Sequence, residues 1–284
     1  MRCVETHTIK QSTPQRKGSL KIRPHCRCPQ TMKLHLLSDT HGTPITPHPE
    51  ADLIVHAGDF GNGRSGAQAF QSACRRAGKP CVFVLGNHDF YGENIDELPR
   101  ELIAANALLL TANRPLEFGG YTFVGGTLFS NFRLPWANKK QFRENLALVR
   151  RNIADFFYIA AGKAPHERRA EPEDYIERFN AQLGFIEQFR HRARTIVLTH
   201  FPPHPVCIAP PYADSPLNPY FINQIDVAGF DCWIAGHTHQ AVDTVQDGCR
   251  LIINPLGYPN EYGANAYRDG LLLELPDLQI TNAV

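Results

Sequence analysis

The sequence lacks any apolar run that approaches the ~20 residues an α-helix needs to cross a bilayer. Its first residues also lack the apolar segment of a secretory signal. We therefore expect no membrane partner and a cytoplasmic location. The 284 residues are 43% hydrophobic and 20% charged, so a sizeable core can form, and the length suits one large domain.

A strong excess of one charge is also missing, since the formal net charge is +1. The charge is uneven along the chain. Residues 1–32 carry seven basic residues and one acidic residue, a net +6, whereas the remainder carries 22 basic and 27 acidic residues, a net −5. That acidic body makes nucleic acid an unlikely main partner. Residues 1–31 show no sustained periodicity, so we expect a disordered basic N-terminal extension.

Paired CxxC motifs are absent too, and the eight cysteines are scattered. No disulfide framework or thiolate zinc site is therefore predicted. Cys81 and Cys232 stand inside apolar runs, where cysteine behaves as a small buried hydrophobe. The cluster His25-Cys26-Arg27-Cys28 is a minor alternative as a metal site.

What the sequence does contain, after Met32, is a series of short apolar runs. Continuous rather than alternating apolar residues are typical of strands in a sheet that is covered on both faces. Helical patterns at 65–77 and 95–105 fall between them, and the whole predicts an α/β (α+β) fold. The runs are Leu34–Leu37, Leu53–His56, Cys81–Leu85, Ile196–Leu198 and Cys232–Ala235. Further predictions are a β-hairpin at 116–124 and antiparallel strands at 241–245, 250–253 and 270–275.

Residues 131–194 differ in composition, being rich in Arg, Glu, Gln and Phe. Two helical patterns lie within them, at about 138–158 and 173–192, the second opening on Pro172 as a first helical turn allows. We interpret this segment as a helical insertion that packs beside the core or caps the site.

Polar side chains follow five of the predicted strands, at the point where each strand ends. They are Asp39 and His41, Asp59, Asn87 with His88 and Asp89, His200, and His237 with His239. Because sites in open α/β sheets form at the carboxyl ends of strands, all five clusters are expected at one edge. Asp, Asn and His offer oxygen and nitrogen ligands, which suit Mn, Fe, Zn or Co. Seven ligands are too many for one tetrahedral site and fit two ions that share a bridging carboxylate.

Taken together, the blocks resemble the calcineurin-like metallophosphoesterase family. All five occur in the family's order over roughly residues 33–256: Asp39-x-His41, Gly58-Asp59, Gly86-Asn87-His88-Asp89, Thr199-His200 and Gly236-His237-x-His239. Phe90-Tyr91-Gly92 and Gly126-Thr127-Leu128-Phe129 also resemble a bacterial branch of that family. The resemblance implies a four-layer β-sandwich flanked by helices, here as a domain over residues 32–284.

The resemblance also implies a role for each residue. Asp39, His41 and His239 hold the first divalent metal ion, Asn87, His200 and His237 hold the second, and Asp59 bridges the two. His88 is the general acid, and Asp89 orients and charges the ring of His88.

The reaction expected from these roles is hydrolysis of a phosphate monoester or diester. Two divalent ions and two carboxylates leave the site positive, so it attracts a phosphate-ester substrate. A hydroxide between the ions attacks phosphorus in line while His88 protonates the leaving oxygen. Two alternatives are a catalytically silent scaffold of the same fold and a nuclease.

Several residues outside the five clusters are further candidates for substrate contact. For each of them the alternative is an ordinary structural role, such as surface charge, packing or a rigid loop. Arginine matches phosphate bidentately, and a long proline-rich loop after His200 can form a lid. The candidates are His204, Arg133, Trp136, Arg143, Tyr212, Asn218 and Tyr220.

Overall fold

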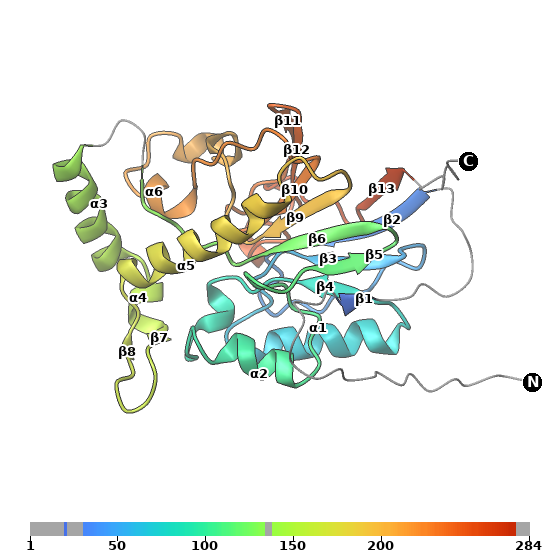
Figure 1. Ribbon diagram of the computed structural model, residues 1–284, viewed down its shortest axis with the longest axis horizontal. Coiled ribbons are helices and arrows are strands. Elements are labelled where there is room, and N and C mark those ends of the chain that lie inside the picture. The colour runs from blue at the N-terminus through green and yellow to red at the C-terminus, as the bar shows by residue number, and fades with distance from the viewer. Residues whose placement is uncertain (1–19, 22–30, 134–137, 277–284) are drawn as a thin grey trace, which may run out of the picture.

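The computed structural model describes residues 20–21, 31–133 and 138–276, and two β-sheets form its centre (Figure 1). The smaller sheet has the order β13 (Leu272–Pro276), β2 (Thr31–Leu37), β3 (Leu53–His56) and β4 (Cys81–Phe83). The larger sheet has the order β1 (Leu20–Lys21), β5 (Leu116–Phe118), β6 (Tyr121–Gly126), β9 (Thr195–Thr199), β10 (Cys232–Ala235), β12 (Cys249–Ile253) and β11 (Val242–Gln246). All five apolar runs of the sequence therefore contain strands, although the run Cys81–Leu85 is a strand only as far as Phe83.

The central strands of both sheets run in parallel. In the smaller sheet β2, β3 and β4 are parallel, and in the larger sheet β6, β9, β10 and β12 are parallel. The predicted C-terminal strands β11 and β13 are antiparallel to β12 and β2, but β12 itself is parallel to β10. The hairpin β5–β6 turns at two glycines, as predicted.

The two sheets pack face to face and bury apolar side chains on both of their surfaces. Leu36 and Val55 from the smaller sheet join Ile196 and Ile234 from the larger one in the core between the sheets. The next residue along the first strand, Leu37, belongs instead to the core on the outer face. The unbroken apolar runs thus have the physical cause predicted for them, namely cover on both faces.

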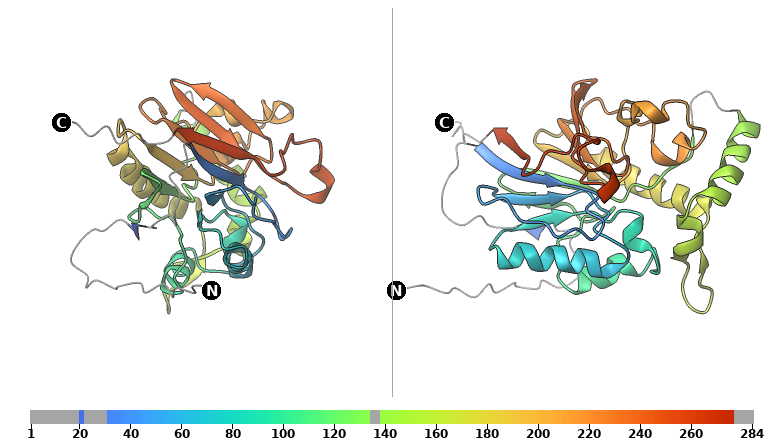
Figure 2. Two further views of the ribbon diagram at one scale, coloured as in Figure 1. Left: turned by 90° about the vertical axis from the view of Figure 1, so that its right-hand side faces the viewer. Right: turned by 180° about the vertical axis from the view of Figure 1, so that it is seen from behind.

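Helices cover the outer faces and complete four layers (Figure 2). Over the smaller sheet lie α1 (Arg64–Arg76) and α2 (Leu98–Ala104), whose buried Phe70 and Leu102 pack in the same core as Leu37. Over the larger sheet lies α5 (Pro172–Ile186), whose Phe179 packs with Trp233. The four-layer β-sandwich predicted from the resemblance is confirmed.

Residues 138–194 contribute to two different parts of the molecule, the outer helical layer and one end of the sandwich. Pro172 occupies the first turn of α5, as expected, and α5 belongs to the outer layer of the sandwich. Before it come α3 (Lys139–Asn152), α4 (Asp155–Tyr158), β7 (Ala160–Ala161) and β8 (Arg168–Arg169). Asn138 caps α3 in a capping box with Gln141. Figure 1 shows α3 and α4 at one end of the molecule, beside α6 (Asn218–Phe221).

Two expectations for the N-terminal segment fall largely outside the described residues. The predicted disordered extension covers residues 1–31, of which Leu20–Lys21 pair in parallel with β5 and Thr31 begins β2. The cluster His25-Cys26-Arg27-Cys28 is not described. Cys81 and Cys232 are buried free thiols, as predicted.

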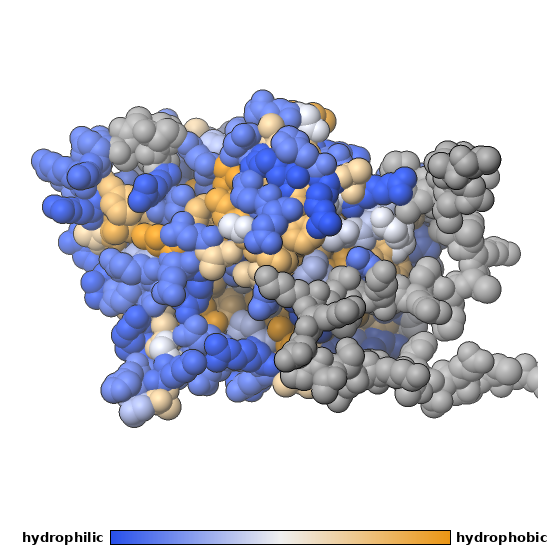
Figure 3. Space-filling view, in the orientation of Figure 1, coloured by the Kyte–Doolittle hydropathy of each residue, from blue (hydrophilic) through white to orange (hydrophobic). Residues whose placement is uncertain are grey.

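The described surface on the face in Figure 3 is mostly hydrophilic, with apolar side chains exposed beside α3. No helix among residues 20–21, 31–133 and 138–276 is long and apolar enough to cross a membrane. The cytoplasmic location stays a prediction.

A substitution at Trp233 tests the packing between α5 and the larger sheet. Trp233 is fully buried, and its indole nitrogen donates to Thr199 Oγ1 at 2.8 Å. Trp233→Ala is expected to lower the free energy of unfolding by about 3–5 kcal/mol in urea denaturation. The control Val245→Ala, at a side chain that is 67% exposed, is expected to change it by no more than about 0.5 kcal/mol. Equal effects of the two substitutions would contradict this packing.

Candidate metal centre

The five polar clusters meet at one edge of the sandwich, where hydrogen bonds tie them together. Asp39 follows β2, and its backbone N–H donates to the Gly58 carbonyl at the end of β3. The N–H of His41 donates in the same way to the Asp59 carbonyl at 3.1 Å. Across the sandwich, the N–H of His237 donates to the Asp39 carboxylate at 2.9 Å. Residues 198 positions apart in the chain therefore face the same space.

Five of the seven predicted metal ligands adopt left-handed backbone conformations. The φ angles are 53° at Asp39, 43° at His41, 60° at Asp59, 74° at His237 and 51° at His239. A non-glycine residue rarely adopts this conformation, which costs on the order of 1 kcal/mol. Strain concentrated in this way is typical of functional sites, where the surrounding structure holds the side chains in place.

Asp39, His41, Asp59 and His239 form the first cluster, with one potential ligand atom from each residue lying within 4.8 Å of all the others. The Nε2 atoms of His41 and His239 are 2.9 Å apart. The other ring nitrogen of His239, Nδ1, lies 2.8 Å from Glu261 Oε2. This contact orients the His239 ring so that Nε2 faces the cluster, in the way that carboxylates commonly hold metal-binding histidines.

Asn87, His200 and His237 form the second cluster, on the other side of Asp59. His200 Nδ1 lies 2.7 Å from the Ala57 carbonyl oxygen, which directs Nε2 toward Asn87 Oδ1 at 3.1 Å and Asp59 Oδ2 at 3.4 Å. The ring of His237 lies 5.0 Å from that of His200. Asp59 Oδ2 also lies 3.9 Å from His41 Nε2, so its carboxylate lies between the two clusters.

The donor set fits divalent cations. The buried Nε2 of His237 has no hydrogen-bond partner among the described residues, although a buried polar atom normally finds one. Burial lowers the pKa of His41 to about 4 and that of His237 well below its usual value, which leaves unprotonated nitrogens. Burial alone would lower the pKa of His200, but the Asp59 carboxylate outweighs it and raises that pKa to about 9. Carboxylate, amide and imidazole donors suit ions such as Mn, Fe, Zn or Co.

His88 lies at the cleft beside these clusters, and its ring contacts differ from those predicted. Nδ1 lies 3.3 Å from Asn62 Oδ1, and Nε2 lies 3.2 Å from the Tyr258 hydroxyl. Its backbone N–H donates to Asp59 Oδ1 at 2.9 Å. Asn62 and Tyr258 therefore orient the ring, and sequence reasoning identified neither.

Asp89 does not have the contacts expected of a residue that orients His88. Its buried carboxylate accepts backbone N–H bonds from Asp59 at 2.9 Å, Phe60 at 2.9 Å and Gly86 at 2.8 Å. Burial and the Asp59 charge raise its pKa, against the opposing effect of the N–H donors. The predicted contact with the His88 ring is wrong, since the carboxylate accepts backbone N–H bonds while the ring nitrogens of His88 contact Asn62 and Tyr258. Asp89 instead joins the loops after β3 and β4.

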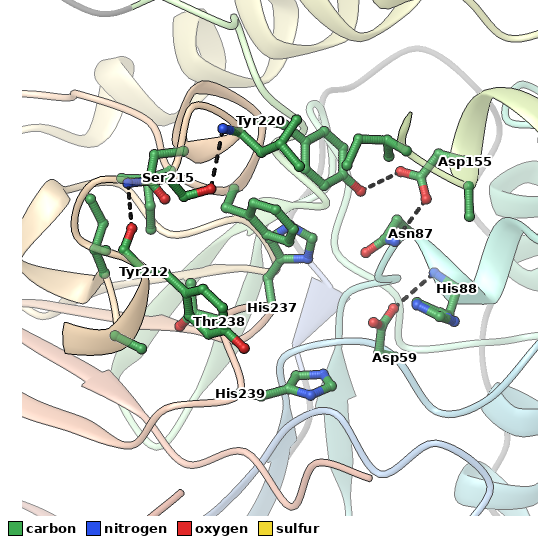
Figure 4. Close-up of a pocket in the computed structure, with 18 of the residues that line it drawn as sticks. Asp59, Asn87, His88, Asp155, Tyr212, Ser215, Tyr220, His237, Thr238 and His239 are labelled. Carbon is green, nitrogen blue, oxygen red and sulfur yellow. Dashed lines mark hydrogen bonds between the residues drawn. The ribbon is translucent and has the colours of Figure 1, made fainter. Parts of the chain in front are cut away.

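Asp155, at the start of α4, was not identified in the sequence. Its side chain is fully buried and accepts four hydrogen bonds, of which Figure 4 shows those from Asn87 and Tyr220. Oδ1 accepts from Asn87 Nδ2 at 2.9 Å, which leaves Asn87 Oδ1 facing His200. The other three donors are the hydroxyls of Tyr91, Tyr175 and Tyr220. An acidic residue amid the apolar residues Ile153, Phe156 and Phe157 was the available signal in the sequence.

A cleft of about 440 Å³ opens from these clusters, and Asp59, Asn87, His88, His237 and His239 line it. Of the weaker candidates, Tyr212, Asn218 and Tyr220 also line the cleft. His204, Arg133 and Arg143 are not among the described lining residues, and Trp136 lies outside the described part of the chain.

A substitution at Gly86 tests whether the loop after β4 must lie as close to Asp59, in the loop after β3, as the structure shows. A Cβ at this position would clash with Asp59 Oδ1 and would lie 2.6 Å from the Asp59 backbone nitrogen. Gly86→Ala is therefore expected to displace the shared carboxylate and weaken Mn²⁺ binding roughly 10–100-fold in calorimetric titration.

The matched control for this substitution is Gly184→Ala in α5, where an added Cβ meets nothing within 4 Å. We expect unchanged Mn²⁺ affinity for it and, if anything, a more stable helix. Full Mn²⁺ affinity in Gly86→Ala would show that Asp59 is not positioned as described.

Comparison with solved structures shows proteins of similar fold. The chain is similar in structure to the phosphopantetheinyl hydrolase from Mycobacterium tuberculosis, with a TM-score of 0.67 and 22% identity over 88% of this chain and 98% of that one. It is less similar to a dimetal phosphatase from Danio rerio, with a TM-score of 0.45 and 17% identity over 78% of this chain and 86% of the other. No curated protein matches the sequence.

The comparison that decides the family is made with the sequence itself. The family model of calcineurin-like phosphoesterases matches residues 32–241, a range that contains all five clusters. The protein therefore belongs to the calcineurin-like phosphoesterase family.

Proposed function

We propose that the protein is a dinuclear metal-dependent phosphohydrolase that cleaves phosphate monoesters or diesters. The observation that carries the proposal is the convergence of two donor clusters around the single buried carboxylate of Asp59. Asp39, His41 and His239 would hold one divalent ion, Asn87, His200 and His237 would hold the other, and Asp59 would bridge them. Mn, Fe, Zn and Co all suit these donors.

Charge makes this centre attractive to a phosphate ester. Two divalent ions bring four positive charges, and only Asp39 and Asp59 oppose them within the ligand set, so a phosphate group is drawn in. When bound, the ions would supply Lewis-acid activation of a water molecule and neutralise charge on the phosphoryl oxygens. The Asp59 carboxylate, which lies between the two clusters, would contribute a ligand to both ions.

His88 is the proposed general acid. Its ring lies at the cleft, where Asn62 contacts Nδ1 and the Tyr258 hydroxyl, itself at the cleft, contacts Nε2. A bound ester would take the place of the Tyr258 hydroxyl at Nε2, while Asn62 continues to hold the ring. In the proposed reaction the oxygen of a water molecule forms a bond to phosphorus as the P–O bond to the leaving group breaks. His88 gives a proton to the departing oxygen and is reprotonated from solvent, which takes up the proton that the attacking water loses. The contact between Nδ1 and Asn62 restricts the rotation of the ring, which keeps Nε2 directed at the cleft.

The two other functions considered fit the site less well. A silent scaffold has no need of strained ligand positions or of a histidine held at the cleft. A nuclease needs a basic groove, and the chain outside its N-terminal 32 residues carries a net charge of −5. The name of the M. tuberculosis protein adds a phosphopantetheinyl ester to the substrates worth screening, together with nucleotides, sugar phosphates and phosphoproteins.

Removal of the shared carboxylate tests the proposal. In Asp59→Ala, Mn²⁺-dependent release of p-nitrophenol from p-nitrophenyl phosphate and bis(p-nitrophenyl) phosphate should fall roughly 10³-fold or more, because both ions lose a ligand. Chelation of the wild-type protein should have the same effect, reversed by added Mn²⁺. Asp214→Ala, at an exposed carboxylate of the proline-rich loop, is the matched control and should keep full activity. Activity that survives both treatments rejects the proposal.

The leaving group tests the role of His88. A poor leaving group such as an alkoxide needs a proton, whereas p-nitrophenolate departs without one. His88→Gln should therefore lower kcat by about 10²–10⁴-fold for an alkyl ester and by less than about tenfold for the p-nitrophenyl ester. His166→Gln, at an exposed histidine outside the site, should change neither rate. Equal losses for both leaving groups would assign His88 a different role.

A further inference from the structure

Part of the cleft lies beyond the metal-ligand clusters and is lined on one side by apolar residues, here called the apolar wall. Ile153, between α3 and α4, forms one part of this wall, and Ile208, Leu217 and Phe221 in and after the proline-rich loop form another. Ile153 is buried and the other three are half-buried. None of these residues belongs to the ligand set or to a strand of the sandwich. The wall is therefore a feature that can vary independently of the metal centre.

Cationic side chains are missing from this wall. Among the described residues that line the cleft, none is a lysine or an arginine, and residues 134–137 contain neither type. Two arginines of the neighbouring segment are engaged elsewhere: Arg150 pairs with Glu171 at 2.5 Å, and Arg133 lies over the Phe142 ring at 5.6 Å. Sites for diphosphates or nucleic-acid backbones normally provide such cations. The described residues of the cleft thus offer no cationic partner for a second anionic group remote from the metal centre.

Free carboxylates are missing as well. Outside the proposed ligand set, the acidic residues of the described lining are Asp155 and Glu261. Asp155 accepts hydrogen bonds from Asn87 and three tyrosines, and Glu261 contacts His239 Nδ1 and accepts from the Tyr258 N–H. Neither is available to pair with a cationic group of a ligand. Tyr212, Ser215 and Asn218, which also line the cleft, are polar but neutral.

From this charge pattern we infer that the substrate has one phosphoryl group joined to an uncharged, largely apolar organic group, which lies against Ile153, Ile208 and Leu217. The inference rests on the proposed phosphohydrolase function and adds the substrate class. A charged organic group would lose its hydration on entering the cleft and would find no oppositely charged side chain in this wall. An apolar group that packs against the wall instead gains binding free energy from the burial of apolar surface. A cleft of about 440 Å³ is of the size that holds a small organic molecule.

The test compares p-nitrophenyl phosphodiesters with the same leaving group and nearly the same chain length, one carrying a hexyl group and the other a 5-carboxypentyl group. Hexyl phosphate and 6-phosphooxyhexanoate form the corresponding pair of monoesters. In whichever series the Mn²⁺-loaded wild-type protein hydrolyses, kcat/KM should be at least about tenfold lower for the carboxylate-bearing ester, because its charge is desolvated without a partner. ATP and single-stranded DNA should be poorer substrates than the neutral ester.

A cation placed in the wall should reverse this preference. Ile208→Lys is expected to raise kcat/KM for the carboxylate-bearing ester and lower it for the neutral one, whereas the control Ile208→Met keeps the wild-type preference. Tyr212→Lys, at a side chain that is 63% exposed, adds a cation at the edge of the cleft without disturbing packed atoms, so it serves if Ile208→Lys does not fold. Circular dichroism confirms folding in each case.

The outcomes separate this inference from the function on which it rests. If no ester is hydrolysed, p-nitrophenyl phosphate and bis(p-nitrophenyl) phosphate included, the proposed function fails. If those model esters are hydrolysed but the wild-type protein favours the carboxylate-bearing ester or ATP, the substrate class is wrong. Folded lysine variants that keep the wild-type preference would likewise overturn it, because the wall would then not contact the organic group.

Discussion

The parallel direction of the central strands in both sheets is the constraint on which the rest of this structure depends. Parallel strands end at the same edge, and here β2, β3 and β4 of one sheet and β9 and β10 of the other end at an edge that the two sheets share. The loop after each strand delivers its polar residues to a common space. A reversal of any of these strands would remove its residues from the site.

Buried hydrogen bonds between the loops keep the edge in its strained conformation. Asp89 joins the loops after β3 and β4 through three backbone N–H donors, while Asp39 accepts from the N–H of His237 across the sandwich. These contacts offset the cost of left-handed backbone at Asp39, Asp59 and His237. The buried carboxylates of this site therefore have two kinds of task, since Asp39 and Asp59 belong to the proposed ligand set and Asp89 holds backbone N–H groups in place.

Much of the fold and most of the candidate ligands could be predicted from the sequence because both leave local signals. An apolar run such as Leu53–His56 marks a buried strand, and a carboxylate that follows at once, Asp59, marks the functional edge. Asp155, Glu261 and Tyr258 do not directly follow a predicted strand, and among them only Asp155 had a local signal, as an acidic residue amid apolar ones. Their importance comes from contacts with Asn87, His239 and His88, which are 68, 22 and 170 residues away in the chain, and only the folded structure brings those pairs together.

The failed expectation for Asp89 has the same origin. Its place next to His88 in the chain indicated a pair of side chains in contact, but the Asp89 carboxylate accepts backbone N–H bonds and the His88 ring contacts Asn62 and Tyr258. Sequence adjacency was a poor guide to contact here, whereas residue type at the end of a strand was a good one. The proline-rich loop and the segment 138–158 stand between these cases, because the sequence indicated their proximity to the site without showing which side chains face the cleft.

A diffraction experiment on crystals soaked with Mn²⁺ tests the central claim most directly. Anomalous scattering locates manganese without reference to activity or to any assumed substrate. The account predicts two adjacent peaks, one among Asp39, His41 and His239 and the other among Asn87, His200 and His237, with the Asp59 carboxylate between them. A single peak that Asp59 does not touch, or no peak at this edge under saturating Mn²⁺, would contradict it.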